Sequence, residues 1–135
     1  MLAHVYKSYK VYRVIVLNLL AQGLNINLYQ RDLEEKLDTI LERADYQITK
    51  SEIRHEIRSN HKMTEKVLNE LEREGLIEII PQERTTLVKI TKKGIFHLRK
   101  WNKFYIDLYK EQIMDHYRYV GLPKWFKEAY HDGGQ

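Results

Sequence analysis

Apolar residues in the first third of the chain recur at helical spacing and predict two helices. Between residues 5 and 22 they follow one another three or four positions apart, and the run from Val14 to Leu17 broadens this stripe. The second half of that helix is therefore expected to be buried on most sides. Another helix is expected over residues 28–44, because Asn27 and Gln30 have the spacing of a capping box ahead of regularly spaced leucines.

Two short helices separated by a turn are expected in the middle of the chain. Thr49 and Glu52 have the spacing of a second capping box, which opens the first of these helices. Ser59 or Asn60 caps the next one, expected over residues 60–74, so that only three or four residues separate the two, as in a helix-turn-helix. The inward positions expected on this second helix are Thr64, Val67, Leu68 and Leu71.

A β-hairpin is expected directly after these helices. Gly75 can take the positive φ that a strand so close behind a helix requires. Residues 76–80 and 86–91 are rich in β-branched side chains, and the polar segment between them fits a hairpin connection. The order helix, turn, helix, hairpin, helix is that of a winged helix-turn-helix, a module whose commonest use is binding duplex DNA. We therefore expect a recognition helix at 60–74 and a wing at 80–86.

The last third of the chain predicts one long C-terminal helix over residues 92–120, capped by Thr91 and ended by Gly121 and Pro123. Two apolar stripes run along it at different angles. One stripe can cover the chain's own core, and the second is expected to pack on the same helix of a second copy, which makes this a dimerisation helix. Alternatively, the first helix and the aromatic residues of the tail cover both stripes within one subunit. The residues expected at the dimer interface are Trp101, Tyr105, Leu108, Tyr109, Ile113 and Tyr117.

The whole chain, residues 1–135, is therefore expected to be a single winged-helix domain, mainly α with a small β-hairpin wing. Its winged-helix core spans residues 5–91 and includes the inserted helix 28–44. A tail, residues 121–135, follows the long helix.

Charge is distributed unevenly along the chain. The formal net charge is +4 and the pI is about 9.2. Residues 76–104 carry seven Lys and Arg against two acids, whereas residues 24–46 carry three against six. Positive charge thus gathers on the expected wing and the start of the helix after it, where a phosphate backbone would run. The alternative is that these side chains only solubilise the surface.

Long polar side chains are expected on the outer face of the recognition helix and on the wing. Lys or Arg can donate to guanine, Asn can pair with adenine, and Glu65 could accept a hydrogen bond from cytosine. Arg84, at the wing tip, can enter a narrow minor groove or hold phosphate. The candidate DNA contacts of the recognition helix are His61, Lys62, Met63, Glu65, Lys66, Asn69 and Arg73. The candidate phosphate contacts outside it are Arg54, Arg58, Lys92 and Lys93, and further along Arg99, Lys100 and Lys103.

Two phrases of the sequence resemble the MarR and PadR groups of winged-helix regulators. They are Glu-Leu-Glu-Arg-Glu-Gly-Leu-Ile-Glu at residues 70–78 and Val-Lys-Ile-Thr-Lys-Lys-Gly at residues 88–94. The resemblance covers about residues 50–105 and implies a homodimer that binds operator DNA with this helix and wing. The positions that match the DNA-facing ones of those groups are Lys62, Met63, Lys66 and Arg84. The wing is shorter than in MarR proteins, and residues 24–46 add an acidic helix.

The remaining residue patterns argue against an enzyme, a bound cofactor or a membrane protein. The chain has no cysteine, its histidines lack metal-type spacing, and a Gly-rich phosphate loop is missing. The longest apolar run is too short to span a bilayer, so we expect a soluble, cytoplasmic protein. The expected function is sequence-specific binding of double-stranded DNA in transcription regulation. The alternatives are a DNA-organising or plasmid-segregation protein, which the abundance of Lys, Glu, Ile and Tyr would suit in an archaeal or viral setting, and a winged-helix adaptor with a protein partner.

Overall fold

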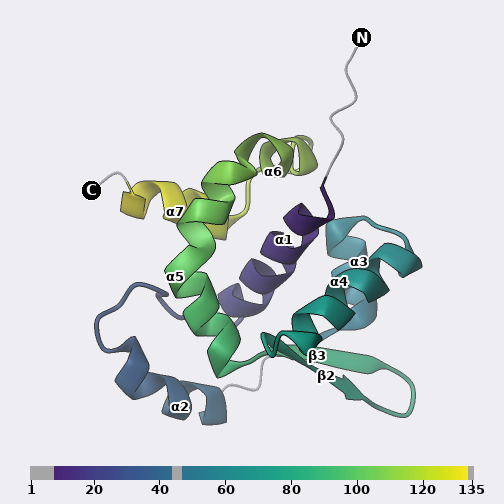
Figure 1. Cartoon of the computed structure of the whole chain (residues 1–135), viewed down its shortest axis with the longest axis horizontal. Coiled ribbons are helices and arrows are strands. Elements are labelled where there is room, and N and C mark those ends of the chain that lie inside the picture. Colours follow the sequence, from purple (N-terminus) through teal and green to yellow (C-terminus); the bar gives the residue numbers. More distant parts are fainter. Residues whose placement is uncertain (1–7, 44–46, 134–135) are drawn as a thin grey trace.

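A computed structural model describes residues 8–43 and 47–133 and shows a winged helix-turn-helix, mainly α with a small antiparallel sheet (Figure 1). The first helices are α1 (Tyr9–Gln22), α2 (Leu33–Arg43), α3 (Lys50–Ile57) and α4 (His61–Arg73). The strands are β1 (Ile48–Thr49), β2 (Ile77–Pro81) and β3 (Thr86–Ile90). The helices after the sheet are α5 (Lys92–Leu108), α6 (Lys110–His116) and α7 (Lys124–Gly133).

Helix α1 forms the centre of the fold, with α5 on one side and α3 and α4 on the other (Figure 1). The side-chain oxygen of Ser8 caps α1 by accepting a hydrogen bond of 3.2 Å from the backbone N–H of Lys10. The expected start near residue 5 lies outside the described residues. As the apolar run predicted, the second half of α1 is buried on most sides, because neighbours pack around it. Its buried residues are Val11, Val14, Ile15, Val16, Leu17, Asn18, Leu20 and Ala21.

Helix α2 is shorter than expected, because it begins at Leu33 and not near residue 28. The side chain of Asn27 accepts a hydrogen bond of 2.9 Å from the N–H of Tyr29, two residues on. Such a bond stabilises a local turn instead of a helix start, so the capping box expected at Asn27 and Gln30 is wrong. The expected last residue of this helix, at position 44, lies outside the described residues. Leu33 and Leu37 are fully buried and attach α2 to the core.

The helix-turn-helix has the predicted caps. The hydroxyl oxygen of Thr49 accepts a hydrogen bond of 3.0 Å from the N–H of Glu52 at the start of α3. Asn60, and not Ser59, caps α4, since its side-chain oxygen accepts a 2.8 Å bond from the N–H of Met63. Between the helices, Arg58 adopts a left-handed conformation with φ of 50°, which turns the chain into α4.

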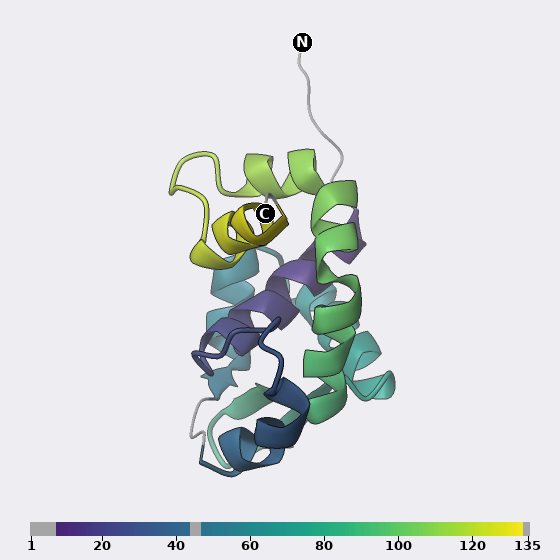
Figure 2. The same ribbon diagram turned by 90° about the vertical axis from the view of Figure 1, so that its left-hand side faces the viewer.

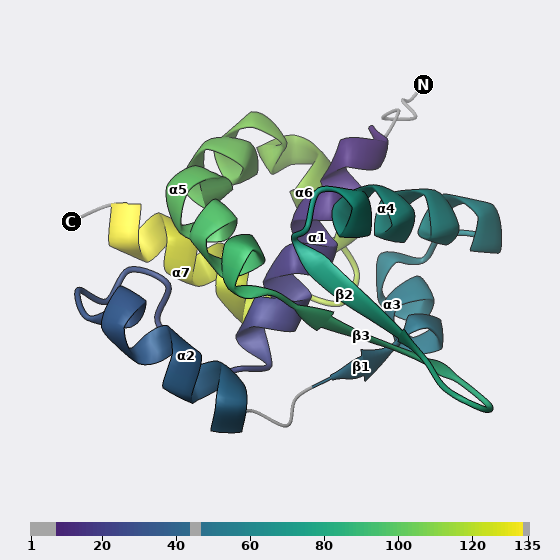
Figure 3. The same ribbon diagram turned by 60° about the horizontal axis from the view of Figure 1, so that its bottom comes forward.

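The wing contains three strands where the sequence predicted two. Strands β2 and β3 form the expected antiparallel hairpin, with Ile79 opposite Val88. The two-residue strand β1 pairs with the other edge of β3, which gives the order β1-β3-β2 (Figure 3). A strand of two residues is too short to leave an alternating pattern in the sequence. Gly75 has the expected positive φ, 78°, between α4 and the sheet.

The long helix expected over residues 92–120 is wrong, because α5 ends at Leu108 and the separate helix α6 follows. The chain bends at Tyr109, whose φ and ψ are −106° and 20°. The bend turns α6 back across the end of α1, where the N–H of Ser8 donates a 2.7 Å bond to the side-chain amide oxygen of Gln112 (Figure 1). A straight helix would carry the apolar residues of α6 into solvent, so burial favours the bend.

Most of the second apolar stripe is covered within the subunit, and only its last residue, Val120, is largely exposed; the other members are Ile106, Tyr109, Ile113 and Tyr117. Ile113 and Tyr117 are buried, and the hydroxyl of Tyr117 donates a 3.2 Å bond to the carboxylate of Glu56 on α3. In the tail, Trp125 and Phe126 on α7 are buried as well. The alternative in which one subunit covers both stripes therefore holds for these positions. In the described part of the chain, no helix combines the length and apolar character needed to cross a membrane.

Candidate nucleic-acid interface

Helix α4 presents an outward stripe of basic and amide side chains opposite its buried face. Thr64, Val67, Leu68 and Leu71 are buried against the core, as the sequence predicted. The exposed side chains on the opposite face are Lys62, Lys66, Asn69 and Arg73, three or four positions apart. We call these four residues the outward stripe. The helix is 13 residues long, roughly 20 Å at 1.5 Å per residue, enough to lie along a major groove.

Glu65 lies on the flank of α4 that faces α3, beside the outward stripe. Its carboxylate forms an ion pair with Lys50 at the start of α3, and His61 Nε2 lies 3.6 Å from the same oxygen, Oε1. The pair neutralises Glu65 and joins the two helices of the helix-turn-helix. Sequence reasoning missed Lys50, because the two residues are fifteen positions apart and meet only through the angle between the helices.

The other glutamates between residues 61 and 74 are also held from the side. A carboxylate oxygen of Glu72 accepts a 3.2 Å hydrogen bond from the N–H of Ile79 on β2. Arg13 of α1 donates bonds of 2.6 Å to both carboxylate oxygens of Glu74, and its Nη1 lies 3.8 Å from a carboxylate oxygen of Glu70. Together with the Lys50–Glu65 pair, these contacts fix α4 against three neighbouring elements and leave positive charge on the outward stripe.

The Arg13–Glu74 contact also changes the protonation equilibria around it. The hydrogen bonds from Arg13 hold the pKa of the Glu74 carboxyl below its ordinary value, and they raise the pKa of the guanidinium in return. On the neighbouring α5, burial is the main cause that lowers the pKa of His97, and the positive charge of Arg13 adds to it. Glu74 therefore remains ionised, and His97 is disfavoured as a cation.

Lys66 and Met63 lie toward the α1 side of the stripe. Lys66 remains exposed, but its Nζ sits 4.2 Å from the centre of the Tyr9 ring, a cation–π contact that directs the side chain along α1. Met63 is partly buried and packs against the core. Of the four residues that the resemblance placed on DNA, Lys62 and Arg84 are therefore the most freely presented.

The wing projects away from the helices as a narrow hairpin (Figure 3). A 2.8 Å hydrogen bond from the N–H of Gln82 to the carbonyl oxygen of Thr85 closes its turn, and Arg84 at this turn is exposed. Across the strands, Lys89 Nζ lies 3.4 Å from a carboxylate oxygen of Glu78. The geometry leaves the Arg84 guanidinium at the far end of a closed turn, where it can reach beyond the body of the protein.

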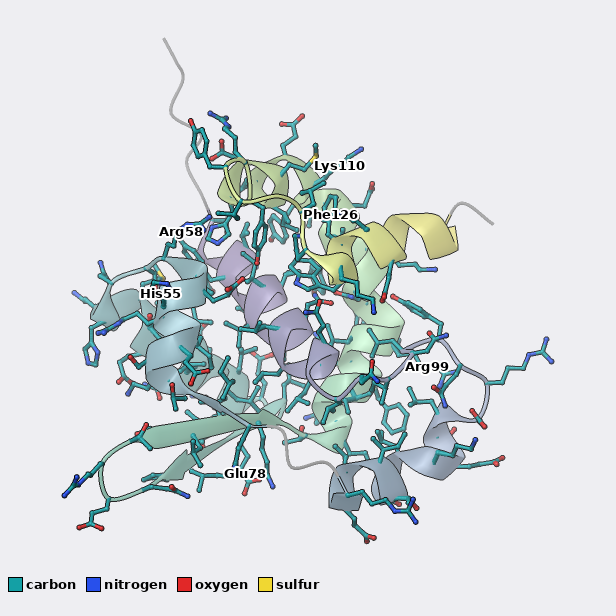
Figure 4. All side chains as sticks on the ribbon, turned by 180° about the vertical axis from the view of Figure 1, so that it is seen from behind. His55, Arg58, Glu78, Arg99, Lys110 and Phe126 are labelled. Carbon is teal, nitrogen blue, oxygen red and sulfur yellow. The ribbon has the colours of Figure 1, made fainter. Side chains whose placement is uncertain are left out.

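The candidate phosphate contacts fall into two separate groups. Arg54 and Arg58 are exposed on or next to α3, and Figure 4 shows His55 and Arg58 on the side toward which the wing extends. Arg99 lies on the opposite side of the molecule in the same view. The structure therefore brings the first group, with the outward stripe and the wing, to one side, and it does not bring Arg99 there.

Lys92 and Lys93 lie at the base of the wing and not at its tip. Lys92 Nζ is 3.0 Å from a carboxylate oxygen of Asp38 on α2, which neutralises it. Lys93 lies beside Gly75, at the end of α4 away from the helix-turn-helix turn. On α5, the Nζ of Lys103 is 4.4 Å from the centre of the Tyr29 ring in the loop before α2. These three cations are therefore spread along α5 and around α2.

The expected dimer-interface residues divide into exposed and buried ones. Trp101 and Leu108 are exposed on α5, and Tyr105 and Tyr109 are half-buried with their rings stacked at 6.4 Å. Ile113 and Tyr117 are inside the subunit, as described above. Sequence reasoning missed Phe104, whose side chain is as exposed as that of Leu108, although its spacing of three from Trp101 was a usable signal. Among the described residues, no group of three or more His, Asp or Glu gathers in a way that could hold a metal ion.

Comparisons with known proteins give one distant structural likeness. No protein-family model matches the sequence, and no curated protein matches it. Among solved structures, the chain is similar to a mutant MarR from E. coli complexed with operator DNA, with 19% sequence identity and a TM-score of 0.39. That alignment covers 92% of this chain and 84% of the other.

Proposed function

We propose that this chain binds double-stranded DNA in a sequence-specific manner, as a homodimer, and acts as a regulator of transcription. Helix α4 would enter the major groove with its outward stripe, and the wing would reach the neighbouring groove or backbone through Arg84. Arg54 and Arg58, on the same side as the wing, would hold phosphates and set the orientation of the protein.

The observation that carries this proposal is that basic and acidic side chains lie on different faces of α4. Its outward stripe consists of Lys62, Lys66, Asn69 and Arg73. The glutamates of the same helix are turned sideways into contacts with α1, α3 and β2. A polar surface that served only solubility would have no need to separate its charges in this way. A surface that meets polyphosphate benefits from this separation, because a carboxylate within the outward stripe would repel the backbone.

Fluorescence anisotropy with a labelled duplex tests this proposal. The titration is run at two salt concentrations for the wild type and for the triple variant Lys62→Ala/Arg73→Ala/Arg84→Ala. Each lost phosphate contact is expected to lower the slope of log K against log salt by about 0.9. The matched control is Arg31→Ala/Lys124→Ala/Lys127→Ala, which removes three exposed positive charges that lie outside α3, α4 and the wing.

We expect the first triple variant to lose binding and the control variant to keep most of it. Equal loss in both would mean that net charge alone drives binding, against the proposed interface. The DNA upstream of the chain's own gene is compared with a random duplex of equal length. Preference for the upstream DNA supports a regulator, and equal binding supports a DNA-organising protein. Absence of binding to both would leave the protein-adaptor alternative.

A further inference from the structure

Three large apolar side chains form an exposed ridge along α5. Trp101 is 40% exposed, and Phe104 and Leu108 are each 57% exposed. Their spacing of three and four positions places them on one face of the helix. The rings of Trp101 and Phe104 contact each other edge to face, with centroids 6.3 Å apart. Single exposed apolar residues are ordinary, but a continuous ridge of this kind marks an interaction surface. We call these three residues the α5 ridge.

The α5 ridge has a flank on which the charge changes sign. Lys100 and Asp107 are both exposed, and they are seven positions apart, which places them on the same flank two turns from each other. Their separation along the helix is roughly 10 Å at 1.5 Å per residue. Among the described residues, neither has an ion-pair partner. The midpoint between them falls next to Phe104, in the middle of the ridge.

This arrangement is complementary to itself under a twofold rotation. If two α5 helices lie antiparallel with the axis beside Phe104, Lys100 of each helix faces Asp107 of the other, and the apolar ridges meet between them. In a parallel pair the two charged flanks would lie on opposite sides of the contact, so neither Lys100 nor Asp107 would face an opposite charge of the other copy. In a twofold contact the same patch is used by both copies, so a patch must carry both signs of charge, symmetrically placed, to be attracted to itself.

We propose that the α5 ridge is the surface on which a second copy of this chain packs, with the two α5 helices antiparallel and Lys100 of each copy opposite Asp107 of the other. This deepens the proposed function, because it supplies the contact of the homodimer invoked there. Helix α5 runs along the edge of the molecule, where a second copy can approach it (Figure 2). The contact uses Trp101 and Leu108 from the residues expected at the interface, and it adds Phe104.

Charge reversal tests the proposal without DNA. The variants are Lys100→Asp, which makes this flank acidic at both positions, and Asp107→Lys, which makes it basic at both. Sedimentation equilibrium or light scattering measures the mass of each variant alone and of an equimolar mixture. Each variant alone is expected to dimerise roughly tenfold more weakly than the wild type, because two exposed ion pairs are replaced by contacts between like charges. The mixture is expected to form dimers again, with one copy of each variant.

Two further variants serve as controls. Phe104→Asp should give a monomer, since it places a charge at the centre of the ridge, and its circular dichroism should match the wild type. If that variant does not fold, the charge-reversal pair decides the question alone. Lys127→Asp, on the exposed side of α7, should leave the dimer intact. A wild-type monomer at micromolar concentration would overturn the proposal, as would a dimer that survives both reversals or a mixture that stays monomeric.

The dimer proposal and the DNA-binding proposal can fail independently of each other. If the dimer is lost in Phe104→Asp while weak duplex binding remains, both proposals stand. If the wild type binds DNA as a monomer, the ridge proposal and the homodimer part of the proposed function both fail, and only DNA binding through α4 and the wing survives. If the wild type is a dimer through the α5 ridge but binds no duplex, only the DNA proposal fails.

Discussion

Arg13 of α1 donates two hydrogen bonds of 2.6 Å to the carboxylate of Glu74, which follows the last residue of α4. A bidentate pair of this kind fixes direction as well as distance, because the planar guanidinium matches the planar carboxylate. The end of α4 is thereby oriented by the central helix. Since Lys50 holds the other half of α4 through Glu65, the outward stripe has a defined orientation relative to the wing.

The Arg13–Glu74 pair predicts a pH-dependent difference in stability between the wild type and Glu74→Gln. The pKa of Glu74 is lowered in the folded protein from its usual 4.5, so its ionised form stabilises the fold at neutral pH. This contribution is lost as the pH falls below about 4.5 and through the lowered folded pKa. Because the Glu74 side chain is 43% exposed, we expect the free energies of unfolding to differ by only about 0.5–1 kcal/mol at pH 7.

Urea unfolding of both proteins at pH 7 and near pH 3 measures this difference. The free energies of unfolding should converge at the lower pH. Glu34→Gln on the exposed side of α2 is the control, and it should show no such convergence. An equal gap between wild type and Glu74→Gln at both pH values would show that the ionised Glu74 carboxylate does not stabilise the fold.

Substitutions of Asn18 and Asn102 are expected to have non-additive effects on the free energy of unfolding. Each side-chain amide donates to the oxygen of the other, at 2.9 and 2.8 Å, inside the contact between α1 and α5. Asn18→Leu or Asn102→Leu alone leaves a buried amide without its partner and is expected to cost about 1–3 kcal/mol. The double substitution removes both polar groups and should cost clearly less than the sum of the two. Additive losses in chemical denaturation would show that the pair is not coupled.

Any side chain at position 94, in the first turn of α5, is expected to clash with its neighbours. A Cβ at this position would overlap the carbonyl oxygen of Leu76 and lie 2.7 Å from Cγ1 of Ile90. Gly94→Ala is therefore expected to lower the free energy of unfolding by about 1–3 kcal/mol, despite the better helix propensity of alanine. Lys93→Ala, one residue earlier and exposed, should change it little. A thermal melt that rises in Gly94→Ala would contradict the close packing of α5 on the segment after Gly75.

Local features were predictable from the sequence because they depend on residues a few positions apart. The caps at Thr49 and Thr91 each receive a backbone hydrogen bond from a residue three positions on, as expected. The inward face of α4 follows from its own periodicity. The sequence showed Gly94 only as part of the phrase shared with known regulators. The structure explains why glycine is needed there, because a Cβ would overlap the carbonyl oxygen of Leu76.

Features that depend on distant parts of the chain were not predictable. The bend at Tyr109 follows from the burial of Ile113 and Tyr117 against elements far earlier in the sequence, and helical periodicity continues through it undisturbed. The pairing of Lys92 with Asp38, 54 positions earlier, was not predictable for the same reason. Charge counts along the chain identify cations but do not show which ones are already neutralised.

Substituting Glu65 distinguishes two roles for this residue, a charge that opposes the DNA backbone or a direct contact to a base. The structure pairs its carboxylate with Lys50, beside the outward stripe. In the proposed complex this charge would oppose the DNA backbone without reading a base. Glu65→Gln is therefore expected to tighten duplex binding by about fivefold or less, the effect of one partly screened charge. Lys50→Gln should weaken it, because the carboxylate is then uncompensated. If Glu65→Gln instead weakens binding only to sequences that carry one particular cytosine, Glu65 reads that base directly.

Mapping the DNA contacts of the labelled protein by NMR tests the proposed interface most directly. Amide chemical shifts of the isotope-labelled protein are followed while an unlabelled duplex is added at moderate salt. We expect the largest changes in the first half of α4, in and next to α3 around Arg54 and Arg58, and at the wing turn around Arg84. Changes concentrated instead on α2 and the Arg99–Lys103 segment of α5, with α4 and the wing unaffected, would contradict the proposed interface.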